Sequence, residues 1–350
     1  MLQWSVPSPA RADAITSLRF FAAAHVVAYH YARDAAGVPE VVTSLLHAGP
    51  ASVGLFFVLS GFVLARRYGD GVPFREYAVA RVARIVPLYW LSLVLSAPLL
   101  LATPHPAAAL LTVPVFLQAW LPHTALAWNE PAWSLSAEMF FYALFPVVLP
   151  WAQRRRSPLR AAALLWVGTM LLLAAAMTVY PPARASFALI PDDAVLVSVL
   201  FNPAAMLPQF AFGVLLGVAR CRIPGWWTAV AAVALAGILC GLPMPRLLMN
   251  GGLLMPLFGL AIAGASRIQG GWLTSRPLVV AGEASYGLYL LQVPVAVWFS
   301  VAYAPAPRAF AAYFTVLLAV SLLTHRWIER PLREAIRRAM ARISPRPAMA

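Results

Sequence analysis

Charged side chains are scarce in this chain of 350 residues, where they make up 11% against 62% apolar residues. The mean hydropathy is +0.77. So little charge cannot solvate the surface of a soluble protein of this size, and the recurring apolar runs exclude a disordered or fibrous chain. The composition therefore predicts a protein that lies in a lipid bilayer.

Lysine is absent, so all 26 basic residues are arginine, and with 12 acidic residues they give a formal charge of +14. A basic chain can bind nucleic acid, but these arginines lie between apolar runs and form no continuous basic face. We therefore expect the charge to set the orientation in a membrane, and we expect no nucleic-acid partner.

Cysteine is also rare. Cys221 and Cys240 are the two in the chain, and no paired spacing indicates zinc binding or thiol redox chemistry. We therefore expect no metal site. No apolar segment precedes Ala14, and the first hydrophobic stretch carries Arg19, so a cleaved signal peptide is not expected.

Long apolar stretches recur along the whole chain, and each is close to the roughly 20 residues that cross a hydrocarbon core of ~30 Å. They predict an all-α, polytopic membrane helix bundle with about ten transmembrane helices. The expected helices run over residues 15–32, 49–66, 84–103, 133–152, 159–179, 195–219, 226–243, 248–266, 279–301 and 309–327.

One further apolar stretch, 107–121, is shorter and contains Pro114. A short, interrupted stretch is typical of an interfacial or re-entrant segment. We expect a single integral membrane domain over 1–350, with its core at 15–327 and an Arg-rich tail at 328–350. The simplest interpretation of this amphipathic tail is a cytoplasmic surface attached to anionic lipid.

The arginines are distributed unevenly between the two sides of these predicted spans. With a cytoplasmic N-terminus, 21 of them fall on the inside, four on the outside, and Arg19 within the first helix. Because basic residues concentrate on cytoplasmic loops, both termini are expected in the cytoplasm. This topology separates Cys221 from Cys240, so no disulfide is expected.

Ionisable side chains inside a membrane are costly, so each is a candidate for function or for buried pairing. Arg19 and His30 lie on one face of the first predicted helix, about 16 Å apart along its axis, whereas His25 points elsewhere. Glu138 begins the fourth helix at a similar depth to His30. A contact between them would orient the imidazole as a general base. A purely structural pair between helices is an equally good interpretation.

Two further groups of polar side chains occur in the predicted helices. Arg81 and Arg84 lie three residues apart, which suits bidentate phosphate binding, although anchoring at the cytoplasmic surface explains them as well. Ser285, Tyr289 and Gln292 share a face of the ninth helix, where they either line a wet cavity or bond neighbouring helices.

The motifs that contain these residues resemble the acyltransferase 3 family of integral membrane acyltransferases, which includes the O-antigen acetylases. They follow one another along nearly the whole chain: SLRFFAAAHVVAYH with Arg19 and His30, GLFFVLSGFVL at 54–64, RVAR at 81–84, WSLSAEMFFY at 133–142, SYGLYLLQVP at 285–294 and ERPL at 329–332. Gln292 is a departure, because many relatives have histidine there. The fused SGNH hydrolase-like domain of some relatives is not matched.

The resemblance implies transfer of an acyl group, expected to be acetyl, from acyl-CoA to a hydroxyl of a glycan or glycosylated acceptor. It implies no permanently bound cofactor, and a separate periplasmic partner would be compatible with it. In this interpretation His30 deprotonates the acceptor, either as a general base or through an acyl-histidine intermediate, and Glu138 orients it. Arg19 stabilises the oxyanion or positions the donor, whose phosphates Arg81 and Arg84 hold.

The remaining candidate residues are expected to line the substrate path. They are Trp133, Ser136, Ser285, Tyr289 and Gln292.

A multi-pass transporter or flippase for a glycan or lipid-linked substrate is the competing class, and a structural or sensory membrane protein is a third. A transporter is expected to show inverted repeats with broken helices at matching positions, and the sequence has no internal repeat. Neither alternative accounts for the ordered motifs. The short loops identify neither the acyl chain nor the acceptor.

Overall fold

The regular elements of the chain are helices throughout the part that the structure describes, which confirms the expected all-α class. The structure is a computed structural model, and it describes residues 10–35, 37–69, 71–184, 193–241, 244–299 and 307–343. The longer helices are α1 (Ala10–Ala32), α3 (Ala51–Arg67), α4 (Phe74–Leu95), α7 (Trp133–Gln153), α8 (Pro158–Val179), α10 (Pro203–Ala219), α11 (Trp227–Gly241), α13 (Met255–Ala265), α17 (Pro307–Thr324) and α18 (Arg330–Ile343).

Shorter helices connect and complete these rods. They are α2 (Glu40–His47), α5 (Ala97–Ala102), α6 (Pro106–Thr112), α9 (Ala194–Phe201), α12 (Arg246–Asn250), α14 (Arg276–Glu283), α15 (Ser285–Leu290) and α16 (Gln292–Trp298). A single π-helical turn, His325–Glu329, joins α17 to α18.

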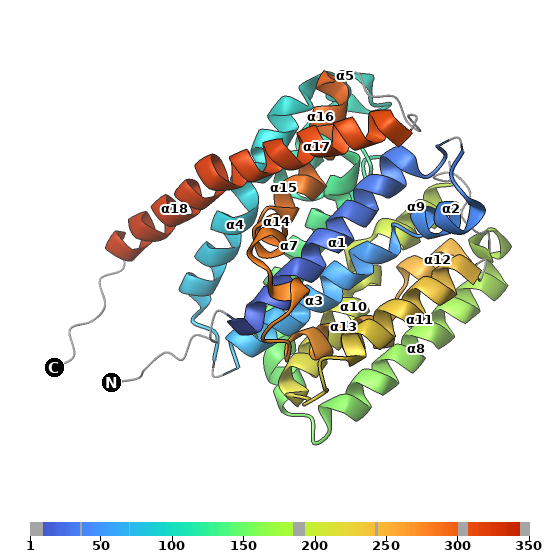
Figure 1. Ribbon diagram of the computed structural model, residues 1–350, viewed down its shortest axis with the longest axis vertical. Coiled ribbons are helices and arrows are strands. Elements are labelled where there is room, and N and C mark those ends of the chain that lie inside the picture. Colours follow the sequence, from blue (N-terminus) through green and yellow to red (C-terminus); the bar gives the residue numbers. More distant parts are fainter. Residues whose placement is uncertain are drawn as a thin grey trace.

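Helix α1 lies inside the bundle, where it packs against α3, α14 and α15 (Figure 1). Helices α17 and α18 form one long rod along the edge, and α18 extends past the other helices beside α4 (Figure 1). Because α1 contacts helices from both early and late parts of the chain, its side chains can line cavities at several depths.

Six helical segments of the described chain are long and apolar enough to cross a membrane. A seventh counts if α2 and α3, which are bent by 47° relative to each other, form one span. These segments make the protein multi-pass, but the predicted count of ten is not confirmed. Helices do occur at all ten predicted places, and the third begins earlier than expected, at Phe74.

The continuous helix predicted over 279–301 is wrong. The described chain forms three short helices there, α14, α15 and α16. Pro294 explains the break between α15 and α16, because proline lacks an N–H and its ring collides with the carbonyl four residues earlier, that of Leu290. That carbonyl instead accepts a hydrogen bond from Asn129 Nδ2 at 3.1 Å.

Helices α3 and α10 pack closely against each other, and glycine makes the approach possible. A Cβ atom at Gly61 would collide with the carbonyl oxygen of Phe210, and one at Gly213 would collide with that of Val58. Such small-residue contacts are the usual means of packing helices in a bilayer, where lipid is as apolar as leucine. The pair forms a fixed wall behind the site described below.

The stretch 107–121 does not form a spanning helix, as predicted. It consists of α6 and two 3₁₀ turns, Val113–Val115 and Gln118–Trp120. Side chains of α4 hold it in place: the Tyr89 hydroxyl donates to the Val113 carbonyl at 2.5 Å, and Trp90 Nε1 donates to the Pro114 carbonyl at 3.1 Å. These bonds give both aromatic residues a packing role.

Candidate active site

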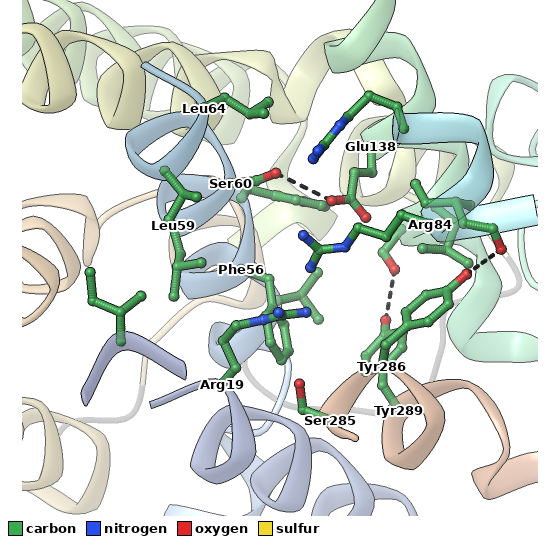
Figure 2. Close-up of a pocket in the computed structure, with 18 of the residues that line it drawn as sticks. Arg19, Phe56, Leu59, Ser60, Leu64, Arg84, Glu138, Ser285, Tyr286 and Tyr289 are labelled. Carbon is green, nitrogen blue, oxygen red and sulfur yellow. Dashed lines mark hydrogen bonds between the residues drawn. The ribbon is translucent and has the colours of Figure 1, made fainter. Parts of the chain in front are cut away.

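A cavity of about 280 Å³ lies between α1, α3, α4, α7 and α15, and we call it the central cavity. Figure 2 shows that Arg19 and Arg84 direct their guanidinium groups into the same space as the Glu138 carboxylate. Arg81 also lines this cavity, so three arginines face one carboxylate. The excess of positive charge suits an anionic or polarised ligand.

A second cavity of about 430 Å³, the basic chamber, lies where α18 and the preceding turn pass α1, α4 and α14. It shares Thr16, Arg19, Arg84 and Tyr286 with the central cavity. The two spaces are therefore neighbours, separated by side chains that line both.

A third and smaller cavity, about 30 Å³, contains His30 and is called the histidine chamber. It shares Val53 and Tyr289 with the central cavity. The three cavities thus follow one another along α1, from Thr16 to His30. At a rise of ~1.5 Å per residue, the step from Arg19 to His30 covers about 16 Å.

Glu138 is held by two hydroxyl groups. Ser60 Oγ donates to Glu138 Oε1 at 3.2 Å, and the Tyr142 hydroxyl donates to the same oxygen. The Ser60 and Tyr142 oxygens also lie 3.3 Å apart (Figure 2 shows Ser60 and Glu138). The carboxylate is therefore fixed in the wall of the central cavity, opposite the arginines.

The predicted contact between His30 and Glu138 is wrong. His30 lies in the histidine chamber, where its Nδ1 is 4.0 Å from Oε1 of Glu130. Glu130 opens the turn that leads into α7, two helical turns before Glu138, so the two carboxylates lie at different depths. Sequence reasoning missed Glu130, although it is the nearest acidic residue before Glu138 in the chain.

The arginines occupy the places that their spacing predicts. Arg81 and Arg84 both line the central cavity, and Arg84 reaches the basic chamber as well. The Arg81 guanidinium lies 5.5 Å from the ring centre of Tyr142, and its buried Nε has no hydrogen-bond partner in the part of the chain that the structure describes. Arg84 is thus the member of the pair that joins the two spaces.

Ser136 does not line the site. Its hydroxyl donates to the Phe116 carbonyl at 2.5 Å and holds the 107–121 stretch against α7. Ser134 lines the central cavity in its place, because it lies four residues before Glu138 on the same helix face, whereas Ser136 lies two residues away on a different face. Sequence reasoning missed Ser134, although that spacing is the signal that could have found it. Trp133 lines the histidine chamber, as expected of a substrate-lining residue.

Tyr289 stands at the boundary between the central cavity and the histidine chamber. Its hydroxyl donates to the Pro131 carbonyl at 2.9 Å and lies 2.8 Å from Ser134 Oγ. Ser285 also lines the central cavity, and no described residue forms a hydrogen bond with its buried Oγ. Both residues therefore lie where the sequence predicted a cavity.

Gln292 lines none of these three cavities, and its expected lining role stays a prediction. Its side chain is fully buried, and its Nε2 donates to the Tyr289 carbonyl at 2.6 Å. The break before α16 ends the shared helix face that placed Gln292 with Ser285 and Tyr289. The structure gives it the role of closing that break.

His25 has a structural environment. Its Nε2 donates to the Leu45 carbonyl at 2.7 Å, and its Nδ1 accepts from the Ser52 hydroxyl at 2.8 Å. Both ring nitrogens are therefore occupied, and His25 faces away from His30 as predicted. Cys221 and Cys240 are both free thiols.

The arrangement combines an arginine-lined cavity with a histidine and a carboxylate one chamber further along. A family model described as an acyltransferase domain, acyltransferase 3, matches residues 13–326. The chain belongs to the acyltransferase 3 family. It is therefore an enzyme of the O-acyltransferase type, and the competing assignment as a transporter or flippase has no support from this match.

Relatives of this acyltransferase carry related names. It is 28% identical over 317 residues to acyltransferase MdmB of Streptomyces mycarofaciens, covering 83% of this chain and 80% of MdmB. It is 27% identical to the exopolysaccharide production protein ExoZ of Rhizobium meliloti, covering 84% and 92%. It is 22% identical to O-acetyltransferase OatA of Staphylococcus aureus, covering 93% of this chain and 58% of OatA. No solved structure matches it.

Proposed function

We propose that this protein transfers an acyl group, acetyl in the simplest case, from acyl-CoA to a hydroxyl of a glycan or glycosylated acceptor. The observation that carries the proposal is the row of three cavities along α1, from an arginine-rich end to His30. Relatives named as an O-acetyltransferase and as an exopolysaccharide production protein support an acceptor of this class.

In the proposed orientation the chain crosses a bacterial inner membrane ten times, with both termini in the cytoplasm. The arginine bias of the predicted inside segments supports this orientation. The basic chamber then opens toward the compartment that holds acyl-CoA, and the histidine chamber lies toward the opposite face. Donor and acceptor approach from opposite sides and meet near Tyr289.

The donor enters with its charged end held by Arg84 and Arg19, and its thioester lies in the central cavity. The lining there supports this placement, because apolar side chains such as Phe56 and Leu59 accompany the arginines. An apolar wall with a few polar groups is typical of small-molecule sites. The fixed Glu138 carboxylate keeps the neighbouring guanidinium groups oriented toward the ligand.

His30 acts as the general base. It takes the proton from the acceptor hydroxyl as the oxygen attacks the thioester carbonyl. The carbon–sulfur bond then breaks, the new ester is released with the acceptor, and the proton from His30 passes to the leaving thiolate to give CoA. The 4.0 Å separation between His30 and Glu130 allows that carboxylate to orient the ring once substrate tightens the site.

The oxyanion that forms on the thioester carbonyl needs a donor near the boundary of the two cavities. Tyr289 has its hydroxyl there and Arg19 provides positive charge from the central cavity. Trp133 lines the histidine chamber beside His30, where the acceptor presents its hydroxyl in this proposal. An acyl-histidine intermediate on His30 is the variant of this mechanism.

The test compares surface glycans and secreted glycosides of a deletion strain with those of its parent by mass spectrometry. A product that is lighter by one acetyl or longer acyl unit in the deletion strain supports the proposal, and its mass names donor and acceptor together. Complementation with wild-type protein must restore the mass and His30→Ala must not. Identical glycan masses in deletion and parent strains would refute the function.

A further inference from the structure

The basic chamber is lined in part by a helix that the family match does not include. The acyltransferase model ends at residue 326, whereas α18 begins at Arg330. Arg330, Arg333 and Arg337 of α18 all line the chamber. Their spacing of three and four residues places them on one face of the helix. Attachment to the membrane surface alone does not explain why three arginines of α18 line a cavity.

The carboxylates of the chamber are already paired. Glu329 binds Arg333 and lies 3.1 Å from His325 Nδ1, and Glu334 binds Arg330 at 3.3 Å. The third, Glu283, lies 3.7 Å from His325 Nε2. Within the described chain, Arg337 forms no ion pair with any of these carboxylates, so its guanidinium group is available to a ligand.

Two further observations point to a ligand in this space. Arg333 Nε is buried and has no hydrogen-bond partner among the described residues, whereas its Nη2 binds Glu329. The chamber holds about 430 Å³, more than the central cavity, and falls within the range of roughly 300–1,000 Å³ that is usual for small-molecule sites. Unused arginine donors in a space of this size are suited to phosphate oxygens.

We propose that the basic chamber binds the phosphorylated adenosine end of acyl-CoA, with Arg333 and Arg337 contacting its phosphate oxygens. This inference rests on the proposed acyl-CoA donor and names its second contact region. Because Arg84 and Arg19 line both spaces, a ligand held by α18 would pass them on its way into the central cavity. Arg81, which reaches only the central cavity, takes no part in holding this end.

Anionic lipid headgroups offer the same phosphate chemistry to α18. The cavity favours the soluble nucleotide, because Arg333 is only partly exposed and lines the chamber together with Arg84 and Tyr286. Arg338 provides the contrast on the same helix: it does not line the chamber, and its Nε donates to the carbonyl of Glu334. An arginine that binds lipid headgroups is expected on the face of α18 that points away from the chamber.

The test measures binding of CoA and of 3′-dephospho-CoA by isothermal titration calorimetry. The full-length protein is studied in phosphatidylcholine nanodiscs as wild type, R337A and R338A. R338A is the matched control, since it removes the same charge from the next residue of the same helix. Wild type is expected to prefer CoA, R337A to bind CoA about tenfold more weakly and to lose that preference, and R338A to behave as wild type.

Three results would overturn the assignment. They are absence of CoA binding to wild type, equal CoA affinities of R337A and R338A, and retained CoA binding by R337A together with lost attachment to phosphatidylglycerol vesicles. The last result would assign Arg337 to lipid. Equal thermal unfolding of the two variants shows that both are folded.

A transfer assay separates this inference from the proposed function. With acetyl-CoA as donor, R337A is expected to raise KM about tenfold at unchanged kcat, and with S-acetylpantetheine, which lacks the phosphates, to leave KM unchanged. CoA binding through Arg337 without any transfer from acetyl-CoA would keep the chamber assignment and refute the function. Transfer by R337A with a wild-type KM for acetyl-CoA would keep the proposed function and refute the chamber assignment.

Discussion

His30 Nδ1 lies 4.0 Å from Oε1 of Glu130, whereas Glu138 binds Ser60 and Tyr142 in the neighbouring cavity. The two carboxylates near the start of α7 are thus divided between two spaces. Glu130 accompanies the histidine, and Glu138 accompanies the arginines. This division gives the two acids separable consequences on mutation.

His30 and His25 lie on the same helix but differ in their surroundings, which makes them a matched pair. His30→Ala is expected to lower kcat by about 10²- to 10⁴-fold, the usual contribution of a general base, with unchanged thermal unfolding. His25→Ala removes bonds to Ser52 and Leu45, so it is expected to lower the unfolding temperature and to keep the activity per folded molecule. Initial rates normalised to folded protein check both, and an active His30→Ala enzyme would contradict the assigned base.

Glu130 and Glu138 provide a second comparison. Glu130→Gln is expected to lower kcat on the order of tenfold, a part of the general-base contribution, because the imidazole loses the carboxylate that orients it. Glu130→Asp, which keeps the charge, is expected to recover part of that loss. The KM for acetyl-CoA is expected to stay unchanged in both.

Glu138→Gln is expected to act on stability and on the donor. It weakens the charge-assisted hydrogen bonds from Ser60 and Tyr142, each worth about 1.5–3 kcal/mol, and disturbs the arginines opposite. Thermal unfolding and the KM for acetyl-CoA measure these effects. Two results together would contradict these separate roles of Glu130 and Glu138. They are normal stability and a normal KM for acetyl-CoA in Glu138→Gln, and an unchanged kcat in Glu130→Gln.

Ser134 and Ser136 test which face of α7 meets the substrates. Ser134→Ala removes the hydroxyl that lies 2.8 Å from the Tyr289 oxygen, so it is expected to lower the transfer rate by several-fold, in line with about 1 kcal/mol for one hydrogen bond. Ser136→Ala releases the Phe116 carbonyl and is expected to lower stability at an unchanged rate. The opposite pattern in rate and melting temperature would place the site on the other face.

Gly61 tests the wall formed by α3 and α10. Gly61→Ala places a Cβ against the Phe210 carbonyl, so it is expected to destabilise the fold by about 1–3 kcal/mol, the usual cost of overpacking. Gly168→Ala on α8 is the control, because a Cβ there meets nothing within 4 Å. Thermal unfolding in the same detergent compares them, and equal melting temperatures would contradict the close approach.

The sequence predicts the helices and much of the central cavity, because helix periodicity and the cost of intramembrane charge are local properties. Arg19, Arg84 and Glu138 were found in this way. An unbroken helix over 279–301 places Gln292 at the cavity, whereas Pro294 indicates a break near Leu290.

Contacts between distant segments were not predictable from spacing. The partner of His30 lies in the turn before α7, and helical depth alone favoured Glu138. The basic chamber was missed for the same reason, since it depends on α18 returning to pack beside α4. The arginine content of the tail predicts its positive charge, but it does not predict the cavity that α18 lines.

Helix α1 carries Arg19 at one end of the path and His30 at the other, and it is wedged against Gly282, where a Cβ atom would collide with the Thr16 carbonyl. A helix is stiff over this length, so any sliding or turning of α1 shifts both ends together. In the proposed mechanism, a shift of α1 on donor binding would therefore move His30 as well, and the helix itself would connect the two substrate positions.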